Sequence, residues 1–307
     1  MSRRSTVRLR AGRRAIEVSR PDKLLFPDGI TKADLALYYA DVAPAMLPYL
    51  AGRPLNLERY PDGIEGQRII QQRASGHFPS WIARAATPMR DGSAVEHVLA
   101  NHPATLVYLA NQGCITLHGW LSRADRLDRP DRLIIDLDPS DDDAAATRRA
   151  ALELDATLRE LGLQPYAMAT GSRGYHLVVP LQRRAGFEQV RSFTRELAAL
   201  AANRNPRLLT IEQRKAKRGG RVLIDVMRNA YGHTAVVPYA VRPRPGAPVA
   251  TPLHEGELAE RSTRPDRFTL KTVRRRLERE GDPWRGAAWK PQTLTRARRL
   301  LRQASEE

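Results

Sequence analysis

The stretch Leu133–Pro139, with the sequence LIIDLDP, decides the expected fold at the centre of the chain. Successive side chains of a strand point to opposite faces of its sheet, so Asp136 and Asp138 share one face and the aliphatic residues share the other. Two carboxylates held this close repel each other unless a positive charge lies between them. Mg²⁺ and Mn²⁺ bind through such oxygen ligands, so the pattern predicts a metal site. A cluster of acids at the start of the next helix is the alternative.

Patterns typical of strands and helices alternate on both sides of this stretch. The helix expected after Thr31 begins with a capping pattern, and Pro44 should kink or end it. A proline-rich segment, residues 242–252, is expected to be an extended strap. The fold class is therefore α/β (α+β), without an internal repeat. The other expected strands are 54–59, 67–72, 114–118, 132–138, 166–170, 175–180 and 221–227, and the other expected helices are 102–112, 143–161 and 187–202.

Charge and composition limit the class of protein. The 307 residues include 51 Lys and Arg against 34 Asp and Glu, which gives a net charge of +17. Such an excess favours a polyanionic partner, and DNA, RNA and an anionic membrane all fit it. The single cysteine, Cys114, excludes an internal disulfide and a cysteine-based zinc site. No long apolar run and no secretory signal are present, so a bacterial-type cytoplasmic protein is expected.

Two further motifs carry chemistry. Asp225 ends the apolar run 221–226, where it is either hydrogen-bonded in place or a third metal ligand. Three acids at strand ends suit phosphoryl transfer with two metal ions about 3.5–4 Å apart. The segment Thr170–His176, TGSRGYH, places two glycines beside polar donors, so its backbone can face an anion such as a nucleoside triphosphate. An ordinary glycine turn between two strands is the alternative.

Taken in order, these motifs resemble the polymerase domain of bacterial DNA ligase D, in the archaeo-eukaryotic primase superfamily. The resemblance extends from about Val18 to Pro252 and implies a primase-type catalytic module with an RNA-recognition-like sheet packed on an N-terminal α/β unit. It rests on the central acids and the TGSRGYH turn together with RPDK (20–23), GITKAD (29–34), AGRP (51–54), LHGW (117–120), RPD (129–131), Asp225 with Arg228 and Asn229, and residues 238–248.

The resemblance also implies roles for individual residues. Two metal ions, with manganese favoured over magnesium, would be held by Asp136, Asp138 and Asp225, which are the implied catalytic residues. The substrate would be a ribonucleoside or deoxyribonucleoside triphosphate, with ribonucleotides favoured. The implied contacts are Thr170, Ser172, Arg173, His176, His118, Arg228 and Arg242 to the nucleotide, Lys23 and Lys32 to a DNA 5′-phosphate, and Arg53, Lys215, Lys217 and Arg218 to DNA near the primer.

The sequence departs from the family pattern in two places. Ile69 and Ile70 stand where the family often has aromatic residues that stack on the template, and an aliphatic side chain can wedge against a base but cannot stack. Arg173 stands where lysine is common, and the charge is kept. Ligase and nuclease portions are absent from the sequence, so a stand-alone form is expected to act alone or with them in trans.

The expected organisation is a basic tail (1–14), a catalytic domain (15–255) and a basic, partly helical C-terminal tail (256–307). The first tail is either solvated and disordered or a phosphate-binding arm. The expected function is a nucleotidyltransferase that fills gaps or extends DNA ends in non-homologous end joining, nucleoid-associated, with DNA, a Ku-type protein and an ATP-dependent ligase as partners and no membrane. The alternatives are a primase that starts chains, a non-catalytic DNA-end-binding module and a metal-dependent nuclease.

Overall fold

The chain forms two compact units, each assembled from three separate segments. The computed structural model describes residues 5–89, 91–286 and 289–306. Unit 1 comprises residues 1–125, 236–250 and 268–281, and unit 2 comprises residues 126–235, 251–267 and 282–307. The boundaries expected from the sequence, at residues 15 and 256, do not follow this division and stay a prediction.

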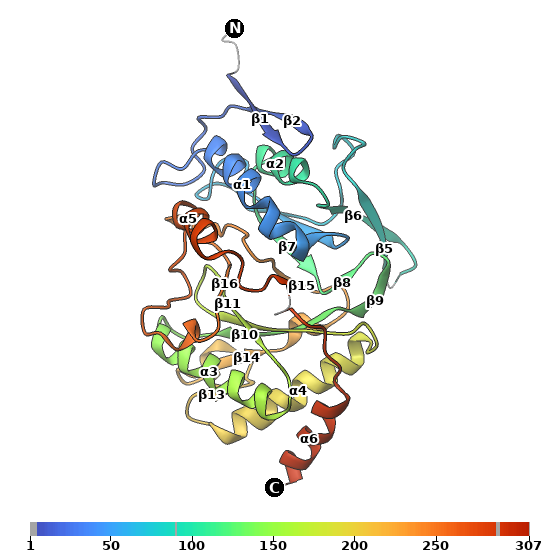
Figure 1. Cartoon of the computed structure of the whole chain (residues 1–307), viewed down its shortest axis with the longest axis vertical. Helices are drawn as coiled ribbons and strands as arrows, with labels where there is room; N and C mark the ends of the chain where they lie inside the picture. Colours follow the sequence, from blue (N-terminus) through green and yellow to red (C-terminus); the bar gives the residue numbers. More distant parts are fainter. Residues whose placement is uncertain (1–4, 90, 287–288, 307) are drawn as a thin grey trace. The chain divides into compact units, whose positions relative to one another are not determined.

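Unit 2 is built on a six-stranded sheet, ordered β13-β14-β10-β12-β11-β16. The helices α3 (Ala144–Glu160) and α4 (Phe187–Arg204) both cover one face of it (Figure 1). The strands of the sheet are β10 (Arg132–Asp138), β11 (Tyr166–Ala169), β12 (Tyr175–Pro180), β13 (Leu209–Thr210), β14 (Val222–Asp225) and β16 (Thr251–Pro252). Unit 2 also holds β9 (Arg126–Pro130), η1 (Lys215–Lys217), η2 (Met227–Asn229), η3 (Glu257–Ala259) and α6 (Thr295–Glu306).

The central strand β10 has the alternation that its sequence predicts. Leu133, Ile135 and Leu137 are completely buried, whereas Asp136 and Asp138 are partly exposed on the opposite side of the strand. Helices on one face therefore leave the other face for polar groups. The predicted bounds of β10 and of its neighbour β12 are confirmed, and the two strands are antiparallel.

The neighbouring strand β14 ends earlier than predicted. It pairs antiparallel with β10 only as far as Asp225, and the helical turn η2 follows. The buried side chain of Asn229 then takes over the edge of β10, accepting a hydrogen bond from Ile134 N (2.9 Å) and donating one to Ile134 O (2.6 Å). The backbone of β10 is thereby satisfied without a strand partner, which gives Asn229 of the Arg228-Asn229 motif a structural role.

Unit 1 contains the second sheet, which includes the order β7-β3-β6-β5 with β4 paired to β3. Its first helix, α1, begins with the predicted capping box between Thr31 and Asp34. The elements of unit 1 are β1 (Thr6–Ala11), β2 (Arg14–Ser19), α1 (Lys32–Leu50), β3 (Pro54–Arg59), β4 (Ile69–Gln71), β5 (Arg84–Pro88), β6 (Ala94–Leu99), α2 (Pro103–Asn111), β7 (Cys114–Trp120), β8 (Ser122–Arg123) and α5 (Leu270–Glu280), and β15 (Thr234–Val236) crosses the boundary between the units.

The structure differs from three expectations in unit 1. Helix α1 continues past Pro44 to Leu50, so the proline does not end it. The basic N-terminal segment is not a disordered tail from residue 6 onward, because β1 and β2 form an antiparallel hairpin; residues 1–4 of the expected tail lie outside the described part of the chain. The proline-rich strap is not extended, since Gly246 (φ +80°) reverses the chain and Val241 bridges Val249.

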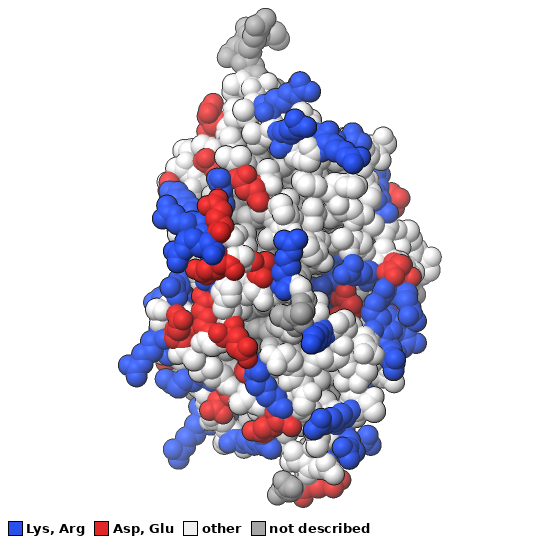
Figure 2. Space-filling model, in the orientation of Figure 1, with Lys and Arg blue, Asp and Glu red and all other residues white. Residues whose placement is uncertain are grey.

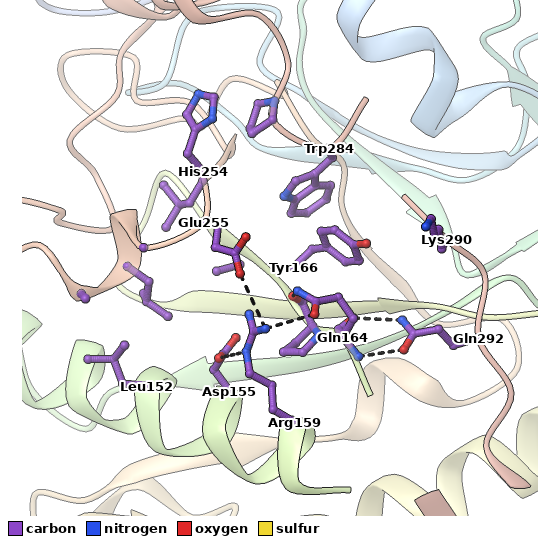
Figure 3. Close-up of a pocket in the computed structure, with 17 residues that line it drawn as sticks. Leu152, Asp155, Arg159, Gln164, Tyr166, His254, Glu255, Trp284, Lys290 and Gln292 are labelled. Atoms are coloured by element: carbon purple, nitrogen blue, oxygen red, sulfur yellow. Dashed lines mark hydrogen bonds and ion pairs between the residues drawn. The ribbon is translucent and has the colours of Figure 1, made fainter. Parts of the chain in front are cut away.

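The segment after residue 281 is fastened to unit 2. The rings of Trp284 and Trp289 stack with centroids 5.2 Å apart, and Tyr166 packs against both. The side-chain amide of Gln292 bonds twice to the backbone of Gln164, at 2.7 and 2.9 Å (Figure 3). This segment leads into α6, which packs on α4. No helix in the described ranges is both long and apolar enough to cross a bilayer.

Candidate active site

The three acids predicted from the sequence come together on two neighbouring interior strands of the unit 2 sheet, β10 and β14. Asp136 on β10 lies directly opposite Asp225 on β14, and on its other side opposite His176 on β12. Asp138 follows two residues after Asp136 on the same face of β10. The antiparallel pairing of β10 and β14 therefore brings Asp225 beside Asp136 and Asp138, although it lies far from them in the sequence.

Asp136 is the most enclosed of these acids. Its carboxylate lies 3.5 Å from His176 Nε2 and 3.4 Å from Arg228 Nε, and its side chain is 16% exposed. Burial opposes its ionisation, but His176 and Arg228 outweigh that effect and lower the pKa of Asp136 to about 2. Asp136 is therefore a carboxylate at neutral pH.

Asp138 is held by two arginines. Its Oδ1 lies 3.4 Å from Arg173 and its Oδ2 lies 3.0 Å from Arg218. Arg218 is almost fully buried and also donates to the carbonyls of Glu212 and Gln213. The guanidinium of Arg218 is thus held beside Asp138, and its predicted contact with DNA near the primer remains a prediction.

Lys215 and Lys217 lie on the short turn η1 just before Arg218, and both are exposed. They remain available to an external anion.

Asp225, the third acid, is oriented by the backbone. Its Oδ1 accepts a hydrogen bond from Met227 N (2.8 Å). Nowhere in the described residues do three His, Cys, Asp or Glu side chains form a ready metal-ligand group; here arginines compensate the acids.

In the glycine turn after β11, several polar groups that were expected to face a ligand form hydrogen bonds within the protein instead. Thr170 donates its hydroxyl and its amide to Gly174 O, at 2.7 and 3.2 Å, and Gly171 N donates to Pro265 O. Two of the amides expected to face an anion are thus already used. A Cβ on Gly174 would lie 1.9 Å from Leu137 O, so only glycine lets the turn approach β10 this closely.

The side chains of this turn nevertheless lie beside the acids. Arg173 is about one-third exposed and contacts Asp138, whereas His176 is buried and contacts Asp136. Within the described structure, His176 Nδ1 is a buried atom without a hydrogen-bond partner. Ser172, at the tip of the turn, is half-buried. The structure thus joins the turn and the acids, which the sequence analysis had predicted separately.

Unit 1 carries a second charged cluster around His118. Glu58 is almost fully buried on β3, where it bonds to His118 Nε2 (3.0 Å), Arg68 Nε (2.7 Å) and Tyr60 OH (3.0 Å). Burial raises the pKa of Glu58, but His118, Arg68 and Tyr60 together lower it to about 2. Burial and Glu58 raise the pKa of Tyr60 to about 12, and the positive charges of Arg68 and Arg242 oppose that rise. Glu58 was missed from the sequence; the one signal was an acid directly after Leu57 in the expected strand 54–59.

The two predicted phosphate-binding lysines also lie near each other in unit 1. Lys23 forms an ion pair with the exposed Asp62 (2.6 Å). Lys32, at the start of α1, is buried and donates weakly to Ser19 and Asn111, each at 3.4 Å. Burial and the nearby charges of Arg20 and Lys23 lower the pKa of Lys32 to about 8. Crowded cations of this kind favour an anionic ligand.

Arg53 has a structural role in unit 1, and its predicted contact with DNA remains a prediction. Its side chain is buried and donates to the carbonyls of Tyr49 (3.0 Å), Trp120 (2.8 Å) and Ser122 (3.2 Å). The five donors of a guanidinium can satisfy several carbonyls at once, and this is its use here. Ile70, by contrast, is half exposed on β4, as a residue that touches a template must be.

Comparison with known proteins identifies the family. The family model described as "LigD, primase-polymerase domain" matches residues 31–284. The chain belongs to that family. The LigD resemblance predicted from the ordered motifs is thereby confirmed.

Full-length LigD proteins are among its relatives. The chain is 32% identical to the multifunctional non-homologous end joining protein LigD of Pseudomonas aeruginosa over 296 residues, which are 94% of this chain and 35% of that protein. It is also 32% identical to the bifunctional LigD of Bacillus subtilis over 266 residues, which are 86% of this chain and 42% of that protein. The chain therefore spans well under half the length of these curated relatives.

A solved LigD structure confirms the fold. The polymerase domain of Mycobacterium tuberculosis ligase D, in complex with DNA, matches with a TM-score of 0.80 and 27% identity. The match covers 86% of this chain and 94% of that domain. The mixed α/β fold of a LigD polymerase domain, predicted from the sequence, is thus present in this protein.

Proposed function

We propose that this protein is a nucleotidyltransferase that extends a DNA 3′-OH from a nucleoside triphosphate at gaps and double-strand breaks. The family and the named activity of the LigD relatives, non-homologous end joining, support this proposal. The observation that carries it is the register of unit 2, in which Asp136 lies opposite both Asp225 and His176 beside the TGSRGYH turn.

The acids fit a pair of divalent metal ions by the chemistry of their donors. Asp136, Asp138 and Asp225 offer only carboxylate oxygens, which are the ligands that Mn²⁺ and Mg²⁺ prefer. Asp136 is ionised well below neutral pH, so no proton has to leave before a cation binds. When bound, such ions activate the attacking 3′-OH and neutralise charge on the phosphates.

The side chains around the acids divide into fixed and movable groups. Arg218 is 6% exposed and tied to two backbone carbonyls, so it stays beside Asp138 and orients it. Arg173 and Arg228 are 37% and 42% exposed, and each makes one long contact of 3.4 Å to an acid. Since a guanidinium binds phosphate through paired donors, these two arginines are free to turn from the acids to the triphosphate.

His176 and Thr170 are two further predicted nucleotide contacts of unit 2. His176 holds Asp136 through Nε2, and its Nδ1 is left to bind a phosphate oxygen once the site rearranges around substrate. Thr170 fixes the turn rather than the ligand, since its hydroxyl is used by Gly174. His118 and Arg242 remain proposed nucleotide contacts on the family resemblance alone. Within unit 1, Glu58 orients His118.

We assign recognition of the downstream DNA 5′-phosphate to Lys23 and Lys32. A terminal phosphate carries more negative charge than an internal diester, so two neighbouring ammonium groups select it by charge. The proposed setting is break repair in the bacterial cytoplasm, with a Ku-type protein and an ATP-dependent ligase as partners. Ribonucleotides are the favoured substrates in this proposal.

The test is primer extension on gapped DNA with Mn²⁺ and each nucleotide set. Asp138→Ala should reduce nucleotide addition by at least about a thousandfold, because the carboxylate that binds charge at the reacting centre is lost. DNA binding should change less than threefold. The matched control is Asp142→Asn, which removes the same charge from an exposed acid four residues beyond β10.

Each alternative predicts a different result. A non-catalytic end-binding module gives no addition by the wild-type protein, and a nuclease shortens the primer instead of extending it. Extension on a template without a primer indicates a primase. Normal addition by Asp138→Ala contradicts the proposed role of the acids.

A further inference from the structure

The segment that follows the family match is rich in arginines that have no acidic partner. The family model ends at residue 284, and the helix α6 begins at Thr295. Its four arginines are Arg296, Arg298, Arg299 and Arg302, and none lies within ion-pair distance of an acid in the described residues. Unpaired cations on a folded element repel one another, so this arrangement has a cost that a polyanion would remove.

Three of the four arginines of α6 are presented on one side of the helix. Ala297 and Leu301 are buried and anchor the opposite side, where α6 packs on α4. Arg296, Arg299 and Arg302 are exposed and recur every three residues, which places them on one face at steps of about 4.5 Å. Figure 2 shows Lys and Arg side chains gathered at the lower right of the view, where α6 lies in Figure 1.

A notch beside α6 adds two more cations to this surface. A cavity of about 230 Å³ lies between the end of β12 and the start of α6, and its lining includes Arg184, Arg298 and Thr295. Arg298 donates to Gln189 O, which fixes its guanidinium in the wall, and Arg184 is exposed. Neither arginine has an acidic partner in the described part of the chain, so the notch is polar, cationic and of a size that admits a phosphate group.

A second cavity borders the segment that leads into α6, and its arginine is paired with acids. A cavity of about 740 Å³ is lined there by Trp284, Tyr166 and Arg159 among others (Figure 3). Arg159 is ion-paired with Asp155 (2.6 Å) and with Glu255 (3.8 Å). The cation of this cavity is thus already neutralised, whereas the cations of α6 are not.

We propose that Arg184, Arg296, Arg298, Arg299 and Arg302 form an accessory surface that binds the phosphate backbone of duplex DNA. We call it the C-terminal arginine face. The proposal rests on the proposed function in that the partner is DNA, but it needs neither a nucleotide nor a metal ion. Four of its five arginines lie beyond the matched family domain, and Arg184 lies within it.

The chemistry of this face favours duplex over single-stranded DNA. Proteins that bind single strands combine cations with aromatic side chains on which bases stack. The described residues of α6 and of the notch include no aromatic side chain. Cations alone neutralise backbone phosphates without reading sequence, and duplex DNA has the higher density of phosphates.

The experiment measures how duplex binding depends on salt. A fluorescent 20-base-pair duplex without gap or nick is titrated with the full chain, without nucleotide or divalent metal, at several concentrations of KCl. The test variant is R296Q/R299Q/R302Q, whose exposed substitutions leave the buried side of α6 intact. Because each phosphate contact contributes about 0.9 to the slope of log K against log salt, the slope should fall by about 2–3.

The control variant is R159Q/R204Q/R264Q, which removes the same charge from unit 2. These three arginines are partly exposed and ion-paired with Asp155, Glu160 and Asp266. Its slope should change by less than about 1, since cations already paired with acids contribute little to counterion release. Urea unfolding and primer extension on a short gapped substrate should be close to wild type for both variants.

Three outcomes overturn the proposal. An unchanged slope in the test variant means that α6 does not contact DNA. An equal loss in the control variant means that only net charge matters. An equal or larger loss with single-stranded DNA means that the face is not a duplex site. None of these outcomes bears on nucleotide addition, which the Asp138→Ala test addresses separately.

Discussion

At the scale of single residues, Asp136 and Asp138 each contact one buried side chain and one more exposed side chain. Asp138 shares its charge between Arg218, which the backbone holds in place, and Arg173, which is more exposed. Asp136 shares its charge in the same way between buried His176 and partly exposed Arg228. Each acid therefore has one buried partner and one more exposed partner, and the proposed binding of a cation and a triphosphate requires only that the exposed partner moves.

Lys32 provides a prediction at this scale, because its pKa of about 8 lies inside the accessible pH range. Its charged form is lost as the pH rises through about 8, whereas a terminal DNA phosphate keeps its full charge above pH 7. The preference for gapped DNA with a 5′-phosphate over gapped DNA without it should fall roughly tenfold between pH 7 and pH 9.5. Fluorescence anisotropy on the two substrates measures this preference.

Two variants test whether Lys32 is responsible for this pH dependence. Lys32→Ala should have little phosphate preference at any pH, while Lys271→Ala, an exposed lysine on α5, should behave as wild type. The sign of the linkage also gives a stability effect. Because the pKa is lower in the folded protein than in the unfolded chain, wild-type stability should rise with pH between about 8 and 10.5. A flat phosphate preference in the wild type would argue against this lysine as the phosphate ligand.

At the scale of elements, β10 and the glycine turn depend on each other. The turn lies so close to β10 that any side chain at Gly174 would collide with Leu137 O, in the residue between the two acids. The close approach brings Arg173 and His176 to the acids. The second glycine of the motif is therefore a packing requirement as much as a ligand-binding feature.

Gly174→Ala should accordingly damage both stability and activity. We expect a loss of about 1–3 kcal/mol in the free energy of unfolding, which is typical of an overpacked site, together with a large loss of nucleotide addition. Gly76→Ala is the matched control, since an added Cβ there meets no atom within 4 Å. Denaturant unfolding of both variants measures the difference. Equal stability of the two would mean that β10 and the turn do not pack as described.

The sequence could predict those parts of the fold whose signals are local. Strand β10, strand β12 and the capping box of α1 were predicted because their signals lie within a few neighbouring residues. Glu58 was missed, and the burial of Arg53 was not predicted, because their partners lie far away in the sequence. A residue's charge shows that it needs a partner, but only the folded chain shows whether that partner is a carbonyl, an acid or DNA.

At the scale of the whole molecule, each unit is assembled from three separate segments of the chain. The periodicity of hydrophobic residues is a local signal, so it predicted the elements but not this interleaving. The basic residues after 256 looked like one tail, yet they supply α5 to unit 1 and α6 to unit 2. The excess of positive charge after residue 256, with 14 Lys and Arg against 8 Asp and Glu, does not by itself locate a DNA surface. The surface proposed here rests on the absence of acidic partners around the arginines of α6 in the described residues.

The most direct test of the proposed function is a single-turnover measurement of nucleotide addition as the metal ion is varied. Wild-type protein is mixed with a gapped, 5′-phosphorylated DNA and one labelled nucleotide, first with a chelator and then with increasing Mn²⁺ or Mg²⁺. We expect no addition with the chelator, restoration by either cation with Mn²⁺ more effective, and no restoration in Asp138→Ala. Addition that proceeds undiminished in the chelator, or that no divalent cation supports, would contradict the assignment of these acids to a two-metal nucleotidyltransferase site.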